Sequence, residues 1–166
     1  MKINYQIISQ LHKLGKILNE LKEEEFTEKD SLLCGSSVGQ HVRHTLEFIE
    51  CLVNTKEGEI LSYDDRKRNL VLESSLDFAL EVIAETELRL AGYIPPEKIR
   101  LKHILNESDH SITDTCGERE LLFVLDHMIH HMALIRIAME NKFQWILLPV
   151  DFGYTPSTLI ARSVPR

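Results

Sequence analysis

The stretch "RELLFVLDHMIHHMALIRIAMEN", residues 119–141, carries the strongest periodic pattern in the chain. Its apolar residues recur at alternating spacings of four and three, which is the pattern of an amphipathic α-helix. The apolar stripe consists of Leu121, Leu125, Met128, Met132, Ile135 and Met139. We therefore expect a helix over about residues 118–141, with one face buried in the core.

Three further segments show helical periodicity, at about residues 3–24, 38–53 and 69–91. The second begins after Ser36 or Ser37, either of which can cap a helix because its hydroxyl accepts an otherwise unbonded backbone N–H. The third is followed by Gly92 and then by a Pro-Pro pair, which cannot continue a helix. These patterns predict four helices in all.

Two segments are not helical in pattern. Residues 98–117, "KIRLKHILNESDHSITDTCG", show a weak apolar alternation that fits either a short hairpin or an irregular crossover. Residues 143–166 are rich in Pro, Gly and aromatic residues, and we expect an irregular tail that packs across the helices. The predicted fold is an all-α four-helix bundle with a long crossover between its third and fourth helices, forming a single domain over residues 1–166.

The composition excludes several classes of protein. Nineteen Lys and Arg residues stand against 26 Asp and Glu residues, giving a formal net charge of −7 without a basic stripe, so nucleic acid is not an expected partner. The N-terminus lacks an apolar signal-peptide core and no long apolar run occurs, so we expect a cytoplasmic protein without a membrane partner. Three cysteines without a C-x-x-C pair indicate reduced thiols and no thiolate metal site.

Of the three histidines in residues 118–141, only two lie on the same face of the predicted helix. At about 100° per residue, His127 and His131 lie on one flank of the apolar stripe, whereas His130 points away from the core. Two imidazoles one helical turn apart can bind the same ion. The helical motif of zinc proteases requires a glutamate directly after the first histidine, where this chain has Met128, so that class is excluded.

A third imidazole ligand could come from His41 or His44 in the helix predicted at residues 38–53. His41 lies nearer the apolar centre of that helix, where core packing can explain it, and His44 lies on the flank. A single histidine is more often an ordinary interior or surface group, but joint placement on two helices favours a site. Three neutral imidazoles leave a coordination position open for water or substrate, which is typical of a catalytic metal. The remaining histidines, His12, His103 and His110, are expected at the surface.

Three residues close in sequence to the candidate ligands can each be interpreted in two ways. Cys51 could be a soft fourth ligand, but a buried small hydrophobe is the favoured interpretation. Glu47 could orient an imidazole, since metal-bound histidines commonly donate their second N–H to a carboxylate, or it could be a solvated helix residue. Asp126 precedes His127 but points elsewhere on the helix, where it could pair with Arg119 or His130.

Two stretches carry a family resemblance. In "SVGQHVRHTLEFIECL", residues 37–52, the "HTLE" run places an acid three residues after His44, and "RELLFVLDHMIHHMALI", residues 119–135, contains H-x-x-x-H. With these stretches nearly the whole chain resembles the DinB/YfiT-like superfamily, bacterial four-helix bundles with a metal-binding histidine triad. "YDDRKR" (63–68) and "VDFGYTPSTL" (150–159) also resemble parts of that pattern. The resemblance implies a triad of His44, His127 and His131.

The resemblance also implies a cofactor and a chemistry. The cofactor would be a divalent metal ion, zinc or nickel first, with iron, manganese or cobalt as further options. In several relatives the metal activates a low-molecular-weight thiol for transfer to a small electrophile, because a bound divalent ion deprotonates a coordinated thiol. The expected function is thus a metal-dependent S-transferase acting on small molecules, or a hydrolase if water is activated instead.

A second hypothesis is a non-catalytic metal-binding or dimerisation module of the stress-response type. The superfamily includes proteins without known activity, and a fold alone does not select a function. On the helix predicted at residues 118–141, Phe123, Ile129 and Ile137 face away from the main apolar stripe. Such a broad apolar surface favours association, so we expect a homodimer.

Overall fold

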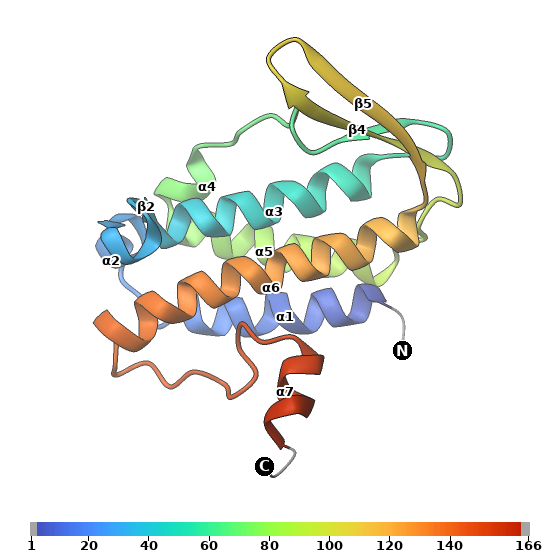
Figure 1. Ribbon diagram of the computed structural model, residues 1–166. Helices are drawn as coiled ribbons and strands as arrows, with labels where there is room; N and C mark the ends of the chain where they lie inside the picture. The colour runs from blue at the N-terminus through green and yellow to red at the C-terminus, as the bar shows by residue number, and fades with distance from the viewer. Residues whose placement is uncertain (1–2, 164–166) are drawn as a thin grey trace.

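The structure, a computed structural model, describes residues 3–163 and contains four long helices that lie side by side (Figure 1). The long helices are α1 (Ile3–Leu18), α3 (Val38–Asn54), α5 (Leu76–Ala91) and α6 (Gly117–Lys142). Short helices occur at α2 (Glu23–Thr27), α4 (Val71–Ser74) and α7 (Pro156–Ser163), and a single 3-10 turn, η1, spans Ser31–Leu33. The expected helices at residues 38–53 and 118–141 therefore agree with α3 and α6 to within one residue at each end.

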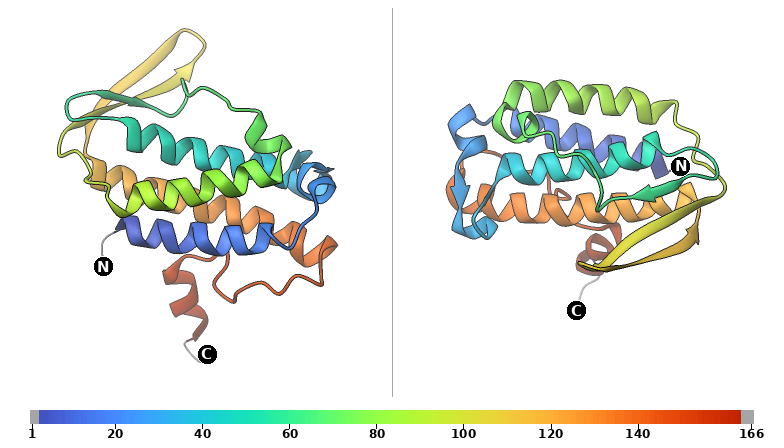
Figure 2. Two further views of the ribbon diagram at one scale, coloured as in Figure 1. Left: turned by 180° about the vertical axis from the view of Figure 1, so that it is seen from behind. Right: turned by 90° about the horizontal axis from the view of Figure 1, so that it is seen from above.

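The core lies among the four long helices. Helix α1 packs against α5 and α6, and α3 packs against the same two helices, so each long helix has two neighbours (Figure 2). The apolar stripe of α6 supplies Met128, Met132 and Ile135, each 1% exposed or less. Their burial removes apolar surface from water and holds α6 in a fixed rotation about its axis. That rotation decides which of its histidines face α3.

The all-α prediction is wrong, because the described residues also form two small β-sheets. Strands β1 (Lys29–Asp30) and β2 (Ser36–Ser37) pair antiparallel before α3. Strand β3 (Ile60–Ser62) pairs parallel with β4 (Ile99–Asn106), which pairs antiparallel with β5 (Asp109–Thr115). The expected long crossover is thus a β-hairpin that starts at one end of the helices and projects away from them beside α3 (Figure 1). These strand pairings make the fold a mixture of helices and small sheets.

Two expected helices are shorter than predicted. The first ends at Leu18 and is followed by the separate helix α2. The third is broken at Ser75, whose backbone is extended and whose hydroxyl accepts the Phe78 N–H at 3.3 Å, so it caps α5. A serine competes in this way with the helix that would otherwise run through it.

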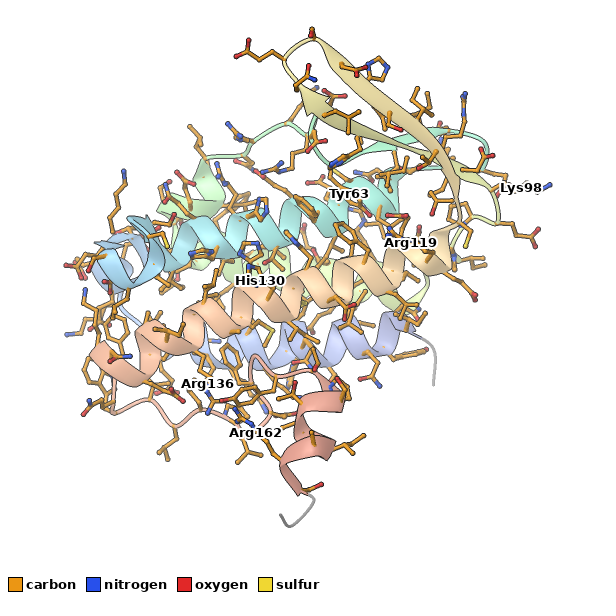
Figure 3. All side chains as sticks on the ribbon, viewed as in Figure 1. Tyr63, Lys98, Arg119, His130, Arg136 and Arg162 are labelled. Carbon is orange, nitrogen blue, oxygen red and sulfur yellow. The ribbon has the colours of Figure 1, made fainter. Side chains whose placement is uncertain are left out.

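The C-terminal tail is only partly irregular, because its last described residues form α7, which contains no buried residue. The tail does pack across α6: Phe152 is fully buried, and its carbonyl accepts a hydrogen bond from Arg136 Nη1 at 2.9 Å. The ring of Tyr154 lies between the guanidinium groups of Arg136 and Arg162, whose proximity is visible in Figure 3. The tail therefore covers the part of α6 around Ala133 and Arg136.

Helix α6 is also long and apolar enough to cross a membrane by length and composition alone. However, 44% of its most apolar window is buried inside the molecule. The buried core helix of a soluble protein has the same features, and α6 packs against both α1 and α3.

We predict that Gly153→Ala destabilises the protein more than Gly58→Ala does. Both glycines have positive φ values, 71° and 77°, so an added Cβ costs each about 1–2 kcal/mol of backbone strain. A Cβ at Gly153 would also lie 2.7 Å from the Ala133 Cα atom, whereas one at Gly58 meets nothing within 4 Å. Urea unfolding should therefore show a further loss of about 1–3 kcal/mol for Gly153→Ala. Equal losses would show that the tail does not pack closely on α6.

Candidate metal centre

Helices α3 and α6 bring histidines from two distant parts of the chain together. Helix α3 begins at a reciprocal cap, in which Ser37 Oγ accepts the Gln40 N–H and the Gln40 side chain accepts the Ser37 N–H. This cap fixes the start of the helix and hence the rotation at which His44 leaves it. His127 and His131 leave α6 one turn apart on the side that faces α3.

Three imidazole nitrogens converge between these helices. His44 Nε2 lies 2.9 Å from His127 Nε2, and His127 Nε2 lies 3.2 Å from His131 Nε2. One nitrogen from each of the three rings falls within 4.8 Å of the other two. Zinc–nitrogen bonds of about 2.0–2.1 Å place neighbouring ligand nitrogens about 2.8–3.4 Å apart for ligand angles between about 90° and 110°. The three histidines are therefore close enough together to hold one metal ion.

The sequence predicted these same three residues as ligands, and the structure brings them together. Among residues 3–163 they form the one group of three or more His, Cys, Asp or Glu side chains with this spacing. Their identity as ligands, and the identity of the ion, stay predictions. His130 is exposed, as its position on the helix predicted, but its ring borders the cluster, with its centroid 5.2 Å from that of His131. The surface positions of His12, His103 and His110 are also confirmed.

His41, the alternative third ligand, lies behind the cluster instead of in it. Its Nδ1 is 2.9 Å from Nδ1 of His131, on the opposite side of that ring from the nitrogen that faces His127. A ring whose Nε2 faces an ion can donate its Nδ1–H outward, and such outer partners orient the ligand ring. His41 is thus placed to orient His131.

Partial burial keeps the clustered imidazoles neutral. Desolvation, followed by the positive charges of Arg66, the other imidazoles and Arg43, lowers the pKa of His44 to about 4. Desolvation and the nearby His130 and Arg66 lower the pKa of His127 to about 4. Desolvation and the neighbouring imidazoles lower the pKa of His131 to about 3. Neutral imidazoles are the form that binds a metal ion.

Stacked rings hold one wall of the site. The Phe48 ring lies nearly parallel to the His127 ring, with centroids 4.2 Å apart and an interplanar angle of 14°. The Tyr63 ring also stacks on Phe48, with centroids 4.7 Å apart and an interplanar angle of 9°. A flat aromatic neighbour restricts rotation of the His127 ring, so its Nε2 points steadily toward the other two histidines.

A buried carboxylate anchors this aromatic wall. Glu120 is fully buried and accepts hydrogen bonds from Tyr63 Oη at 3.0 Å, Thr115 Oγ1 at 2.7 Å and Arg119 Nη1 at 2.9 Å. Burial and the Glu120 charge raise the pKa of the Tyr63 phenol, so this group stays a hydrogen-bond donor. Figure 3 shows Tyr63 and Arg119 at the same end of α6. The sequence analysis missed Glu120, because an acid in the first turn of a helix is normally solvated.

Glu47 is buried and is linked to His44 through Arg66. It is 2% exposed, its Oε2 accepts Arg66 Nε–H at 2.9 Å, and its Oε1 accepts the Asn69 N–H at 2.8 Å. Arg66 in turn lies 2.8 Å from His44 Nδ1 through its Nη2 atom. Of the two readings of Glu47, the solvated residue is excluded, and its link to the imidazole runs through Arg66. Arg66 itself was missed, although it belongs to the "YDDRKR" stretch that carried part of the resemblance.

The other candidates lie outside the cluster. Cys51 is partly buried against the core, and desolvation raises its thiol pKa to about 11, which is the behaviour of a small hydrophobe. Asp126 is exposed. A cavity of about 680 Å³ lies near the start of α1 and α6 and is lined by residues that include Asn4, Pro95 and Cys116 but none of the histidines.

The chain was compared with family models, curated proteins and solved structures, and none of them matches. The resemblance to the DinB/YfiT-like superfamily therefore stays a prediction that rests on the quoted motifs. The geometry of the three histidines is independent of that resemblance.

We predict that acid destabilises the metal-free protein through these histidines. Their pKa values of about 3 to 4 lie below the value of about 6.5 expected in the unfolded chain, so the unfolded state binds more protons as pH falls through this window. The free energy of unfolding should fall between pH 6.5 and 4 by this mechanism.

Urea titrations at several pH values in the presence of a chelator measure this dependence. Replacing His44, His127 and His131 together by Gln should flatten it. The matched variant with Gln at the exposed His12, His103 and His110 should keep the dependence of the unaltered chain. An equal slope in the two triple variants would contradict the assignment.

Proposed function

We propose that this protein binds one divalent metal ion through His44, His127 and His131 and uses it to activate a small nucleophile. The observation that carries the proposal is the convergence of three imidazole nitrogens from α3 and α6, at separations of 2.9 and 3.2 Å. Low pKa values for all three rings supply the neutral donors that such a site needs. Zinc and nickel are the first candidates, and iron, manganese or cobalt also accept imidazole ligands.

The donor set points to catalysis over a purely structural role. Structural zinc sites are commonly closed by four protein ligands, whereas three histidines leave a position for an exogenous molecule. A divalent ion held in this way lowers the pKa of a bound thiol or water into the neutral range. The residues of the chain orient the donors: Phe48 stacks on His127, and His41 contacts the outer nitrogen of His131. We propose a thiol S-transferase first and a hydrolase second, in line with the DinB/YfiT resemblance.

A second candidate function is a metal-binding or dimerisation module without chemistry. It is favoured by apolar side chains that remain in solvent around the tail, where Trp145, Leu147 and Val150 are 61%, 90% and 84% exposed. Exposed apolar groups of this kind favour association. Of the helix α6 residues expected to support a homodimer, however, Ile129 is buried within the chain and only Ile137 is clearly exposed. A homodimer therefore stays a proposal, to be measured by sedimentation.

The metal site is tested by elemental analysis of protein purified without a histidine tag. We expect close to one divalent ion per chain in the unaltered protein. We expect its loss in His44→Ala, His127→Ala and His131→Ala, because two imidazoles alone bind divalent ions weakly. His130→Ala is the matched control, since His130 lies on the same helix, is exposed and borders the His131 ring without belonging to the group of three. Equal metal content in His130→Ala and His131→Ala would contradict the site.

The proposed chemistry has its own test. The metal-loaded protein should accelerate consumption of a low-molecular-weight thiol by an epoxide or an aryl halide, measured as loss of free thiol. A chelator or His127→Ala should abolish this acceleration, and His130→Ala should not. Stoichiometric metal without acceleration of thiol transfer or of ester hydrolysis would support the module without chemistry.

A further inference from the structure

Arg66 meets the proposed ligand His44 in a way that is unusual for a metal site. An arginine side chain has five N–H donors and no acceptor, and it stays charged in proteins. Arg66 Nη2 lies 2.8 Å from His44 Nδ1, so it donates a hydrogen bond to that nitrogen. Metal-bound histidines normally do the reverse and donate their second N–H to a carboxylate, a carbonyl or water.

This contact decides where the proton of His44 sits. A neutral imidazole carries one N–H, and a ring nitrogen that accepts a hydrogen bond must be the nitrogen without the proton. Since Nδ1 of His44 accepts from Arg66, its proton is on Nε2, which lies 2.9 Å from His127 Nε2. A protonated Nε2 has no lone pair to offer an ion. In this arrangement His44 is bonded to its neighbours but is not a ligand.

Arg66 is held firmly in this position. Its side chain is 10% exposed, Nε donates to Glu47 Oε2 at 2.9 Å, and Nη1 donates to the Tyr63 carbonyl at 2.9 Å. Its guanidinium carbon also lies 5.1 Å from the centre of the Phe48 ring. The side chain is thus placed between His44 and the buried carboxylate of Glu47.

Glu47 is the natural outer partner of His44 when Arg66 is elsewhere. The two residues are three apart on α3, so their side chains project from neighbouring positions on one face. A carboxylate at that position can accept Nδ1–H of His44, which frees Nε2 as a ligand. The tautomer change moves no net charge, because one proton leaves Nε2 as another joins Nδ1.

We propose that Arg66 is a positioning residue that controls whether His44 can ligate the ion. In the metal-free protein Arg66 stands between His44 and Glu47 and His44 carries its proton on Nε2, so an ion that binds must displace this contact and is bound less tightly as a result. With Arg66 withdrawn, Glu47 accepts the Nδ1–H and His44 completes the triad with His127 and His131. This inference rests on the proposed metal site and adds a regulatory contact to it.

The first arm of the test needs no metal. In ¹⁵N-labelled, chelator-treated protein, the ¹⁵N chemical shifts of the imidazole nitrogens distinguish a protonated nitrogen from an unprotonated one. We expect an unprotonated Nδ1 and a protonated Nε2 for His44, and reversal of this pattern in Arg66→Gln, whose amide can donate to Glu47 and accept from His44. A protonated Nδ1 in the unaltered protein would overturn the proposal.

The second arm measures zinc affinity by competition with a chromophoric chelator. Arg66→Gln should bind zinc about tenfold tighter, at the lower end of the range for changes in the outer partners of a metal ligand. Arg43→Gln is the matched control: Arg43 also pairs with Glu47, lowers the pKa of His44 through its charge and is similarly buried, but its ion pairs are with Glu47 and Glu73. The Arg43→Gln variant should therefore change zinc affinity only by the effect of removing a positive charge.

The outcomes test the control by Arg66 and the proposed metal site separately. Tighter binding in Arg66→Gln than in Arg43→Gln supports the control by Arg66, and equal or weaker binding overturns it. If Arg66→Gln fails to fold because Glu47 is left without its main partner, the double variant Arg66→Gln/Glu47→Gln removes both charges. That variant should still show the reversed His44 tautomer. Absence of zinc binding in every variant would refute the proposed function, while the tautomer would still test the contact between Arg66 and His44.

Discussion

The contact between α3 and α6 is the constraint on which the candidate site depends. Each helix alone provides at most two imidazoles on one face, and only their side-by-side packing brings His44 to within hydrogen-bond distance of His127. The packing is set by buried apolar residues, among them Val42 and Ile49 on α3 and Met128 and Met132 on α6. Burial of these side chains supplies the free energy that keeps three partly desolvated imidazoles together.

Part of this arrangement could be predicted from the sequence because it depends on the spacing of apolar residues within single helices. The apolar stripe predicted α6, and a cap at Ser36 or Ser37, which the structure shows to be Ser37, predicted the start of α3. The positions on the helical wheel separated His127 and His131 from His130. The choice of His44 over His41 came from the resemblance, and the structure places His41 behind His131 instead of beside His127. The helical periodicity of residues 118–141 was therefore sufficient to predict the helix, though not the third ligand.

Other features could not be predicted because they depend on contacts between distant residues. Strand β3 is three residues long and, among the described strands, pairs only with β4, so no pattern within residues 60–62 distinguishes it from a loop. The same reasoning applies to Arg66, which lies in a polar loop yet reaches the buried Glu47 and His44. The break at Ser75 was overlooked because apolar spacing continued across it, while the decisive bond is a side-chain cap.

The three imidazoles of α3 and α6 are the proposed ligands of a single divalent ion. The most direct measurement is a crystal structure of tag-free protein grown with zinc, with data collected on both sides of the zinc absorption edge. We expect one anomalous peak between the helices, about 2.0–2.1 Å from a nitrogen of each of His44, His127 and His131. A peak bound instead by His41 or a cysteine, or no peak between α3 and α6, would contradict it.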